Sequence, residues 1–168
     1  MSDFHPAFEK MIVAEGGYRL TDTPGDMGGQ TYAGISRKYH PRWQGWAFID
    51  RAETPPSDLV RGFYRENFWE PIRGDSIMRQ DIADSVFSFA VNAGVGISIK
   101  LMQVVVGATP DGNVGEKTLM ALNSADPIAF RYAFALAKIA RYRDIVQRDK
   151  SQIKFLMGWI NRTLKDAT

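Results

Sequence analysis

The stretch MIVAEGGYRL, residues 11–20, ends an apolar run with a glutamate, two glycines and a tyrosine. Upstream, apolar residues recur at helical spacing: Phe4, Phe8, Met11, Ile12 and Ala14. This pattern predicts an amphipathic helix over residues 4–15. Because Gly16 and Gly17 are poor helix formers, we expect the helix to stop there and to leave the carboxylate of Glu15 at its end.

Composition sets the class of protein. The 168 residues fit one domain, or one domain with a small appended lobe, and 45% hydrophobic with 24% charged residues is typical of a soluble globular protein. The net charge of +2 is compatible with an anionic polymer as partner. Nucleic acid is not expected, because the sequence has no concentrated Lys/Arg stripe and no phosphate-binding pattern in its Gly-rich loop.

Cysteine and histidine usage argues against cofactors. The absence of cysteine excludes disulfides and Cys-based zinc sites, and the two histidines, His5 and His40, are not in a metal-binding spacing. We therefore expect neither a metal nor another cofactor.

The N-terminal residues MSDFHPAFEKM lack the basic and apolar regions of a signal peptide. No run approaches the roughly 18 apolar residues of a membrane span. We expect synthesis in the cytoplasm without stable membrane insertion. A chain of this kind that acts on the cell wall or in the periplasm would have to be released by a pore, such as a holin, or by lysis.

The rest of the chain predicts a mainly α fold with a small turn-rich or β insert after the first helix. Residues 18–34 are dense in Gly, Pro, Asp and Thr, which indicates turns or an irregular hairpin. Residues 35–41 suggest a short helix ended by a proline, and residues 42–56 a connection. Further helices are expected from Ser57, as N-cap, to about residue 68, and from about residue 80 with a break at NAGVG (92–96). Asp126-Pro127 is expected to cap a longer helix over 127–148, with Phe130, Phe134, Ala137 and Ala140 inward. A last helix is expected over 151–165.

Glu15 and the loop after it could carry out acid catalysis. An acid that donates a proton near neutral pH needs a pKa above about 4.3, which apolar surroundings and a helix C-terminus both favour. We expect residues 11–14 to supply such surroundings, and the two glycines to leave room for a ligand. Asp22, Asp26 and Thr31 lie on the following turns, and glycosidic cleavage needs a second polar group opposite the acid. Alternatively, Glu15 is a surface residue and the aspartates are turn formers.

Four ordered motifs carry a family resemblance: EGGY at 15–18, TDTPGDMGGQTYAGIS at 21–36, FWEPIRGD at 68–75 and FAVNAGVG at 89–96. Together they resemble the glycoside hydrolase 108 family, N-acetylmuramidases of bacteriophages and bacteria. The resemblance implies a lysozyme-like, mostly helical fold with Glu15 as the catalytic acid. Phage and bacterial origin are both compatible with it.

A looser similarity to phage-type lysozymes concerns the second catalytic group. Their order of Glu, Asp and Thr before Gly-Ile, aligned backwards from Gly34-Ile35, places the aspartate on Asp26 and the threonine on or beside Thr31. The intervening residues depart from the usual D-P-G-G and Asn-Tyr pattern, so Asp22 stays a rival to Asp26.

The C-terminal part carries a second resemblance. A Leu-x-Gln helix, Asp111-Gly112 with Gly115, and a Thr-Leu pair are similar to small helical peptidoglycan-binding modules. The same residues could simply form a tight turn between core helices. We expect a catalytic region at residues 1–92 and a peptidoglycan-binding-like region at 93–168, packed into one compact monomeric unit.

The predicted function is hydrolysis of the β-1,4 bond between N-acetylmuramic acid and N-acetylglucosamine in peptidoglycan glycan strands. Tyr18 and Tyr32 would stack on sugar rings and Asn92 would bind an N-acetyl group, although Asn92 could equally cap the helix break. A lytic transglycosylase and a non-catalytic wall-binding protein are the alternatives. Inversion and retention stay open because they depend on the separation of the carboxylates.

Overall fold

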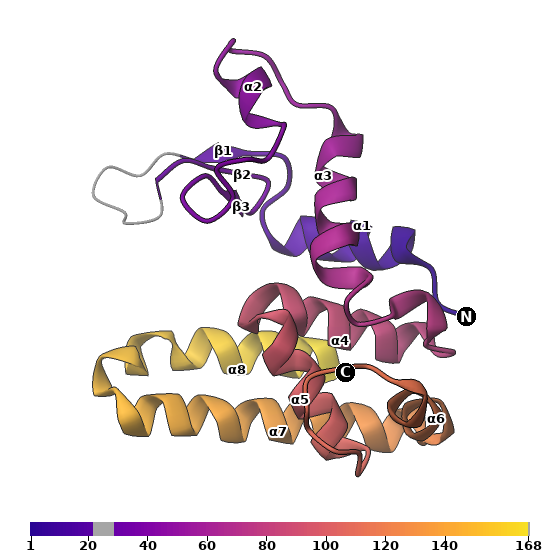
Figure 1. Cartoon of the computed structure of the whole chain (residues 1–168). Coiled ribbons are helices and arrows are strands. Elements are labelled where there is room, and N and C mark those ends of the chain that lie inside the picture. The colour runs from indigo at the N-terminus through magenta and orange to yellow at the C-terminus, as the bar shows by residue number, and fades with distance from the viewer. Residues whose placement is uncertain (22–28, 168) are drawn as a thin grey trace. The chain divides into compact units, whose positions relative to one another are not determined.

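The computed structural model describes residues 1–21 and 29–167. The chain divides into two compact units, residues 3–70 and residues 71–168 together with Met1 and Ser2 (Figure 1). The mainly helical fold with a small sheet after the first helix is as predicted. None of the described helices is long and apolar enough to cross a membrane.

The first unit begins with α1 (Phe4–Ala14). The side chain of Asp3 caps this helix by accepting a hydrogen bond of 2.9 Å from the backbone N–H of His5. The apolar face of α1 supplies much of the core of the unit, because Phe8 is fully buried and Phe4 packs its ring 5.7 Å from that of Trp69.

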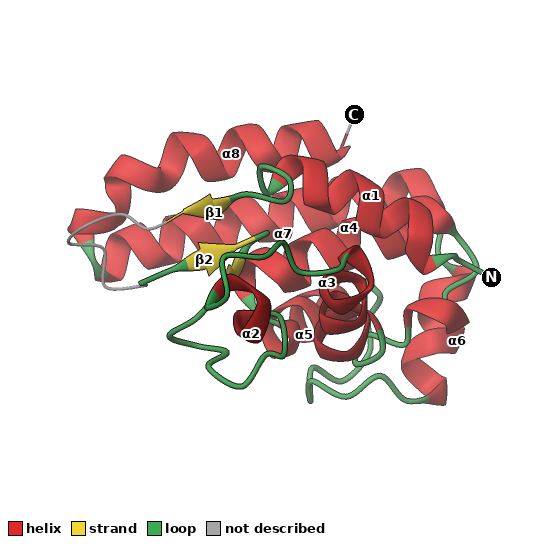
Figure 2. Ribbon diagram, turned by 90° about the horizontal axis from the view of Figure 1, so that it is seen from above, coloured by secondary structure: helices red, strands yellow, loops and turns green. Residues whose placement is uncertain are grey.

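Three two-residue strands follow: β1 (Leu20–Thr21), β2 (Thr31–Tyr32) and β3 (Ile35–Ser36). They form an antiparallel sheet in the order β1-β2-β3, in which β1 and β2 run side by side (Figure 2). The predicted short helix over 35–41 is wrong, because Ile35 pairs with Tyr32 and is completely buried. Pairing and burial outweigh the weak helical tendency of this segment.

The remainder of the first unit is helical. A short α2 (Trp46–Ile49) lies where only a connection was expected, and the indole of Trp46 donates to the carbonyl of His40 at 2.8 Å. The next helix, α3 (Ser57–Tyr64), continues as a π-helical segment η1 (Arg65–Trp69). Its N-cap is Pro56, not Ser57 as predicted, because the extended backbone of Pro56 lets the helix begin one residue earlier.

The second unit contains η2 (Gly74–Ser76), α4 (Gln80–Ala93), α5 (Val95–Val105), α6 (Glu116–Ser124), α7 (Pro127–Arg148), η3 (Lys150–Gln152) and α8 (Ile153–Ala167). The predicted break at NAGVG is confirmed, and Gly94, with φ of +95°, separates α4 from α5. The predicted cap of α7 is confirmed as well, since the Asp126 carboxylate accepts from the N–H of Ala129 at 2.7 Å.

The buried face of α7 differs from the predicted one. Phe130 and Phe134 are buried as expected, but Ala137 is half-buried and Ala140 is exposed. Residues spaced by four continue the buried row instead: Lys138, Tyr142 and Val146. Lys138 is only 2% exposed, and its ammonium group lies 3.2 Å from both Ser85 Oγ and Asp166 Oδ2. A buried cation thus joins α4, α7 and α8.

The turn before α6 is built around the side chain of Gln103, which is completely buried. Its amide nitrogen donates to Asp111 Oδ1 at 2.8 Å and to the Asn113 carbonyl at 2.9 Å, and its oxygen accepts from the N–H of Gly112 at 3.0 Å. Gly112 has φ of +85°, a conformation that favours glycine. In the motif that is similar to peptidoglycan-binding modules, Gln103 and Asp111-Gly112 therefore hold the turn before α6.

Candidate active site

Glu15 is the C-cap residue of α1. The N–H of Gly17 donates to the Ile12 carbonyl at 2.8 Å, and the N–H of Gly16 donates to the Val13 carbonyl at 3.2 Å. These two bonds form a Schellman motif, which requires a residue in the left-handed region immediately after the helix. Gly16, with φ of +91°, meets that requirement. The EGGY sequence thus fixes the direction in which the chain leaves Glu15.

Gly34 lies directly beside the side chain of Glu15, and the hydroxyl of Tyr64 lies beside Gly34. A β-carbon at Gly34 would be 3.6 Å from Cβ of Glu15 and would collide with the hydroxyl of Tyr64. That hydroxyl donates to the carbonyl of Ala33 at 2.8 Å. Burial, reinforced by the negative charge of Glu15, raises the pKa of Tyr64 well above its usual range. Residues from α1, the β2–β3 turn and α3 therefore meet at one point.

The prediction that residues 11–14 give Glu15 apolar surroundings is only partly correct. Met11 and Ile12 are buried in the core, whereas Val13 is 75% exposed and Ala14 is exposed. Helical geometry explains this, because consecutive side chains of a helix point in different directions. The half-buried Glu15 instead borders the backbone of Gly34, and its charge acts on the hydroxyl of Tyr64. Around Gly16 and Gly17 the space is open, since an added β-carbon at either would meet no described atom within 4 Å.

The sheet presents a row of hydroxyl groups that includes Thr31. Thr21 pairs with Thr31, and Thr31 pairs with Ser36. Directly paired residues of antiparallel strands share one face of the sheet, so the three hydroxyl side chains lie on the same face. The opposite face carries Tyr32 and Ile35, which are buried. Thr31 is half-buried, and its carbonyl accepts a 3.3 Å hydrogen bond from the Thr21 hydroxyl.

The two candidate aspartates, Asp22 and Asp26, lie outside the described residues. Both belong to the segment that joins Thr21, the last residue of β1, to Gly29 ahead of β2. Which of them serves as the second carboxylate stays a prediction.

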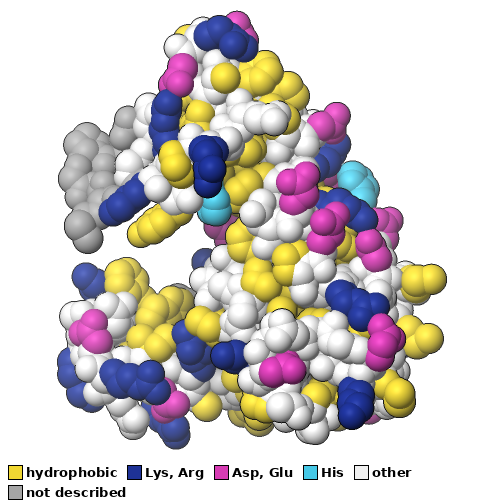
Figure 3. All heavy atoms as spheres, in the orientation of Figure 1, with side chains coloured by type: hydrophobic (Ala, Val, Ile, Leu, Met, Phe, Trp, Pro, Cys, Tyr) yellow, Lys and Arg dark blue, Asp and Glu magenta, His cyan; other side chains and the backbone are white. Residues whose placement is uncertain are grey.

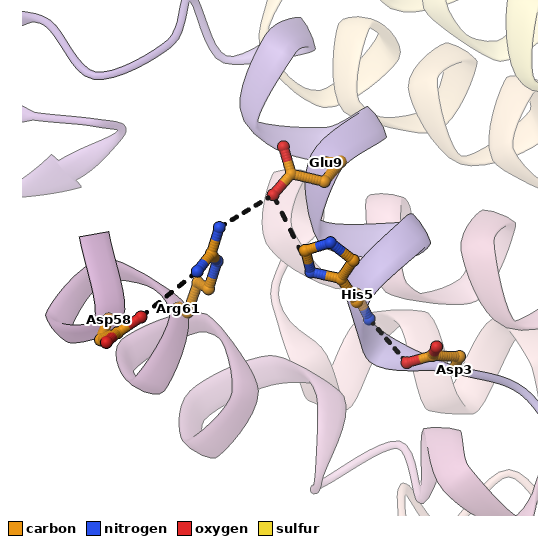
Figure 4. A network of polar contacts seen from close by, with 5 residues as sticks. All are labelled: Asp3, His5, Glu9, Asp58 and Arg61. Carbon is orange, nitrogen blue, oxygen red and sulfur yellow. Dashed lines mark hydrogen bonds and ion pairs between the residues drawn. The ribbon is translucent and has the colours of Figure 1, made fainter.

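A network of charged side chains joins α1 to α3 (Figure 4), and its charges act on the hydroxyl of Tyr18. Arg61 is at the centre of the network, 3.4 Å from a carboxylate oxygen of Glu9 and 3.2 Å from one of Asp58. Burial raises the pKa of Tyr18, the positive charge of Arg61 opposes that rise, and Glu9 and Asp58 add to it. Tyr18 is 39% exposed, so its ring is accessible close to the start of the loop after Glu15.

Tyr32 has a different environment from Tyr18. It is 4% exposed, and its ring stacks on that of Trp43 with centroids 6.0 Å apart, which leaves it little surface for a ligand. Its hydroxyl is buried and has no hydrogen-bond partner among the described residues. The ring holds the sheet against the segment that leads to α2.

Asn92 belongs to the second unit, near the end of α4. Its side-chain amide donates to the carbonyl of Ser88, one turn back, at 2.8 Å. The amide thus makes a local bond within its own helix, and the contact of Asn92 with an N-acetyl group stays a prediction. The side chain itself is exposed.

Sequence reasoning missed Tyr64 as a neighbour of Glu15. The apolar spacing of α3 indicates that this residue is buried, but it does not indicate where the hydroxyl points. No motif singled out Tyr64, and the contact becomes visible only when α3 and the β2–β3 turn are placed in space.

No group of three or more His, Cys, Asp or Glu side chains in the described part of the chain could hold a metal ion. On the face shown in Figure 3, Lys and Arg side chains are interspersed with Asp and Glu.

Comparison with known proteins gives the class of the molecule. The sequence model of Glycosyl hydrolase 108 matches residues 8–94, and that of the Predicted Peptidoglycan domain matches residues 97–164. The chain is thus a glycosyl hydrolase joined to a peptidoglycan-binding region, a peptidoglycan hydrolase in the broad sense. Because the first match spans more than half of the sequence, the chain belongs to the glycosyl hydrolase 108 family.

A solved structure extends the similarity over almost the whole chain. The structure of Brucella abortus SagA is 26% identical, has a TM-score of 0.77, and is matched over 98% of this chain and 91% of that one. No curated protein has a significant match to this sequence.

Proposed function

We propose that this chain is an N-acetylmuramidase that hydrolyses the β-1,4 bond between N-acetylmuramic acid and N-acetylglucosamine, with Glu15 as general acid. The position of Glu15 carries the proposal. Glu15 caps α1 inside the part of the chain that matches Glycosyl hydrolase 108, Gly34 borders its side chain, and the Tyr64 hydroxyl holds the turn that contains Gly34. The open space at Gly16 and Gly17 leaves room for a sugar on the other side.

The second polar group comes from the loop and sheet that follow Glu15. Asp26, with Asp22 as its rival, would activate water or stabilise the positively charged transition state. Thr31 would assist from the hydroxyl row of the sheet. Asp26→Asn is expected to lower the rate by about tenfold or more, and by more than Asp22→Asn, because general acid–base groups typically contribute about 10² to 10⁴. A larger loss for Asp22→Asn would reverse the assignment.

The remaining parts of the chain would bind the polymer. Tyr18 is exposed near Glu15 and could stack on a sugar ring. The region matched by the Predicted Peptidoglycan domain would hold the enzyme on the wall. Asn92, exposed on α4, is the proposed contact for an N-acetyl group.

Mass spectrometry of the products formed from purified peptidoglycan tests this proposal. A muramidase releases fragments with reducing N-acetylmuramic acid ends. Anhydro-muramyl ends would identify a lytic transglycosylase instead. Sedimentation with peptidoglycan without any released sugar would identify a non-catalytic wall-binding protein.

A further inference from the structure

The first unit contains a groove away from the candidate active site, since Glu15, Gly34 and Tyr64 are not among the residues that line it. Its volume is about 770 Å³. We call it the α3 groove. One wall is the segment of residues 38–44, between β3 and α2. The other wall comes from α3 and the start of η1: Asp58, Leu59, Gly62, Phe63, Glu66 and Asn67.

The two walls of the α3 groove carry opposite charges. The segment wall supplies Lys38 and Arg42, and the helical wall supplies Asp58 and Glu66. Asp58 is paired with Arg61 at 3.2 Å. Arg42 and Glu66 have no ion-pair partner among residues 1–21 and 29–167, and both side chains are exposed. The groove therefore offers a free cation and a free anion to a ligand that carries both charges.

Packed aromatic rings line part of the groove. Phe63 is buried, and the ring of His40 packs edge-on against it with centroids 4.7 Å apart. Burial lowers the pKa of His40, so this ring adds little positive charge at neutral pH. Trp43 also packs edge-on against Phe63, at 6.5 Å. These contacts hold the shape of the groove without a ligand.

Gly62 lines the α3 groove, and the packing of the protein does not explain why this position is a glycine. It lies inside α3, where glycine costs about 1 kcal/mol relative to alanine. A β-carbon there would meet no described atom within 4 Å, and the backbone is not in the left-handed region. Neither a steric contact nor a turn accounts for this glycine. Close approach of a ligand to the helix would account for it.

We propose that the α3 groove binds the peptide stem of peptidoglycan, an inference that rests on the proposed function. A stem peptide carries free carboxylates and, in its diamino acid, an ammonium group. Its charges match Arg42 on one wall and Glu66 on the other. A neutral N-acetylated sugar carries no charge that could pair with either side chain, so the charge pattern favours the peptide over the glycan.

Titration of the full chain with a soluble stem tetrapeptide, Ala–Glu–diaminopimelate–Ala with the natural stereochemistry, tests the inference by calorimetry or NMR. Gly62→Leu places a side chain in the groove and is expected to weaken binding by at least about tenfold. Gly158→Leu is the matched control, because Gly158 is also a helical glycine whose added β-carbon would meet no described atom within 4 Å. It should bind the peptide like the wild type.

Charge variants keep the test independent of folding. Arg42→Gln and Glu66→Gln change only exposed side chains without ion-pair partners in the described part of the chain, and each should weaken binding. Unchanged binding in these variants and in Gly62→Leu would overturn the inference. Displacement of the peptide by an uncharged N-acetylglucosamine oligomer would also overturn it, because the groove would then be a sugar subsite.

The same measurements separate this inference from the proposed function. A wild-type chain that releases sugars from peptidoglycan but does not bind the tetrapeptide would contradict the α3 groove alone. The opposite result would be a wild-type chain that binds the tetrapeptide but releases no sugars, with binding lost in the Gly62→Leu variant. That result would contradict the muramidase proposal alone.

Discussion

Gly34 packs against the side chain of Glu15, and a β-carbon at position 34 would lie 3.6 Å from Cβ of that glutamate. The turn that contains Gly34 is held by the hydrogen bond from Tyr64 to Ala33. Three segments that are distant in sequence thus fix the position of one carboxylate. In the proposed function, these supporting residues would hold the catalytic acid in place.

Gly34→Ala should destabilise the first unit and lower activity. The left-handed backbone at φ of +80° disfavours a β-carbon, and the methyl group would collide with the Tyr64 hydroxyl. We expect a loss of more than about 2 kcal/mol in the free energy of unfolding, from backbone strain and overpacking together. Urea denaturation measures it.

Gly29→Ala is the control for Gly34→Ala. Gly29 also has a positive φ, +64°, but its added β-carbon would meet no described atom within 4 Å. Backbone strain alone predicts the smaller loss, about 1 kcal/mol. Equal losses for the two variants would show that the contact between Gly34 and Tyr64 is not tight. If Tyr64→Phe partly restores the stability of Gly34→Ala, the tight contact between Gly34 and the Tyr64 hydroxyl is supported.

Tyr64→Phe alone tests the support of the turn. The change removes a buried 2.8 Å hydrogen bond and leaves the Ala33 carbonyl unsatisfied, which costs about 1–3 kcal/mol. Tyr132→Phe, at a residue that is 54% exposed, should be nearly neutral. Thermal denaturation compares the two. A Tyr64→Phe variant as stable as Tyr132→Phe would mean that the hydrogen bond does not hold the turn.

Gln103→Leu should destabilise the second unit. The substitution removes the bonds to Asp111, Asn113 and Gly112 and leaves several of these groups without a partner, at a cost of more than about 2 kcal/mol. Gln147→Leu, at an exposed position of α7, is the control. Hydrogen exchange of the Gly112 amide should increase in the first variant only. Unchanged protection would show that the turn does not depend on Gln103.

Lys138 makes stability depend on pH in the alkaline range. Burial lowers the pKa of Lys138 below its usual 10.5, although the charge of Asp166 opposes this. Between the folded and the unfolded pKa, the unfolded chain binds more protons, so this group makes the folded state more stable as pH rises. The free energy of unfolding of the wild type, minus that of Lys138→Met, should rise as the pH increases toward 10.5, the usual pKa of lysine.

The Lys138→Met variant is subtracted from the wild type because Tyr142, also buried in this unit, changes stability in the opposite direction as pH rises. Burial raises its pKa above 10.0, so its ionisation favours the unfolded state at high pH. Both proteins share that effect. A difference that stays flat or falls would contradict the account of Lys138.

Local signals predicted much of the fold. Consecutive glycines ended α1, Gly94 separated α4 from α5, and Asp126-Pro127 began α7, because each acts on the backbone near it. The strand at Ile35–Ser36 was missed, because its pairing with β2 outweighs local propensity. The cation at Lys138 was missed too, since its partners Ser85 and Asp166 come from other helices.

The candidate site shows the same division between local and distant information. Motifs pointed to Glu15 and Thr31, which belong to the segment that carries the family resemblance. The proximity of Tyr64 to Glu15 could not be predicted, because it depends on how α3 packs against the turn at Gly34. The hydroxyl row from Thr21 to Ser36 depends on strand register, which the composition of the loop does not specify.

The most direct test of the central claim is the rate at which Glu15→Gln releases reducing sugars from purified peptidoglycan. The substitution keeps the size of the side chain but removes the proton donor, so the rate should fall by about 10² to 10⁴. Glu70→Gln, which alters only an exposed ion pair with Arg65 at 3.4 Å, is the control and should match the wild type. A Glu15→Gln variant that releases sugars as fast as the wild type would contradict the assignment of Glu15 as the catalytic acid.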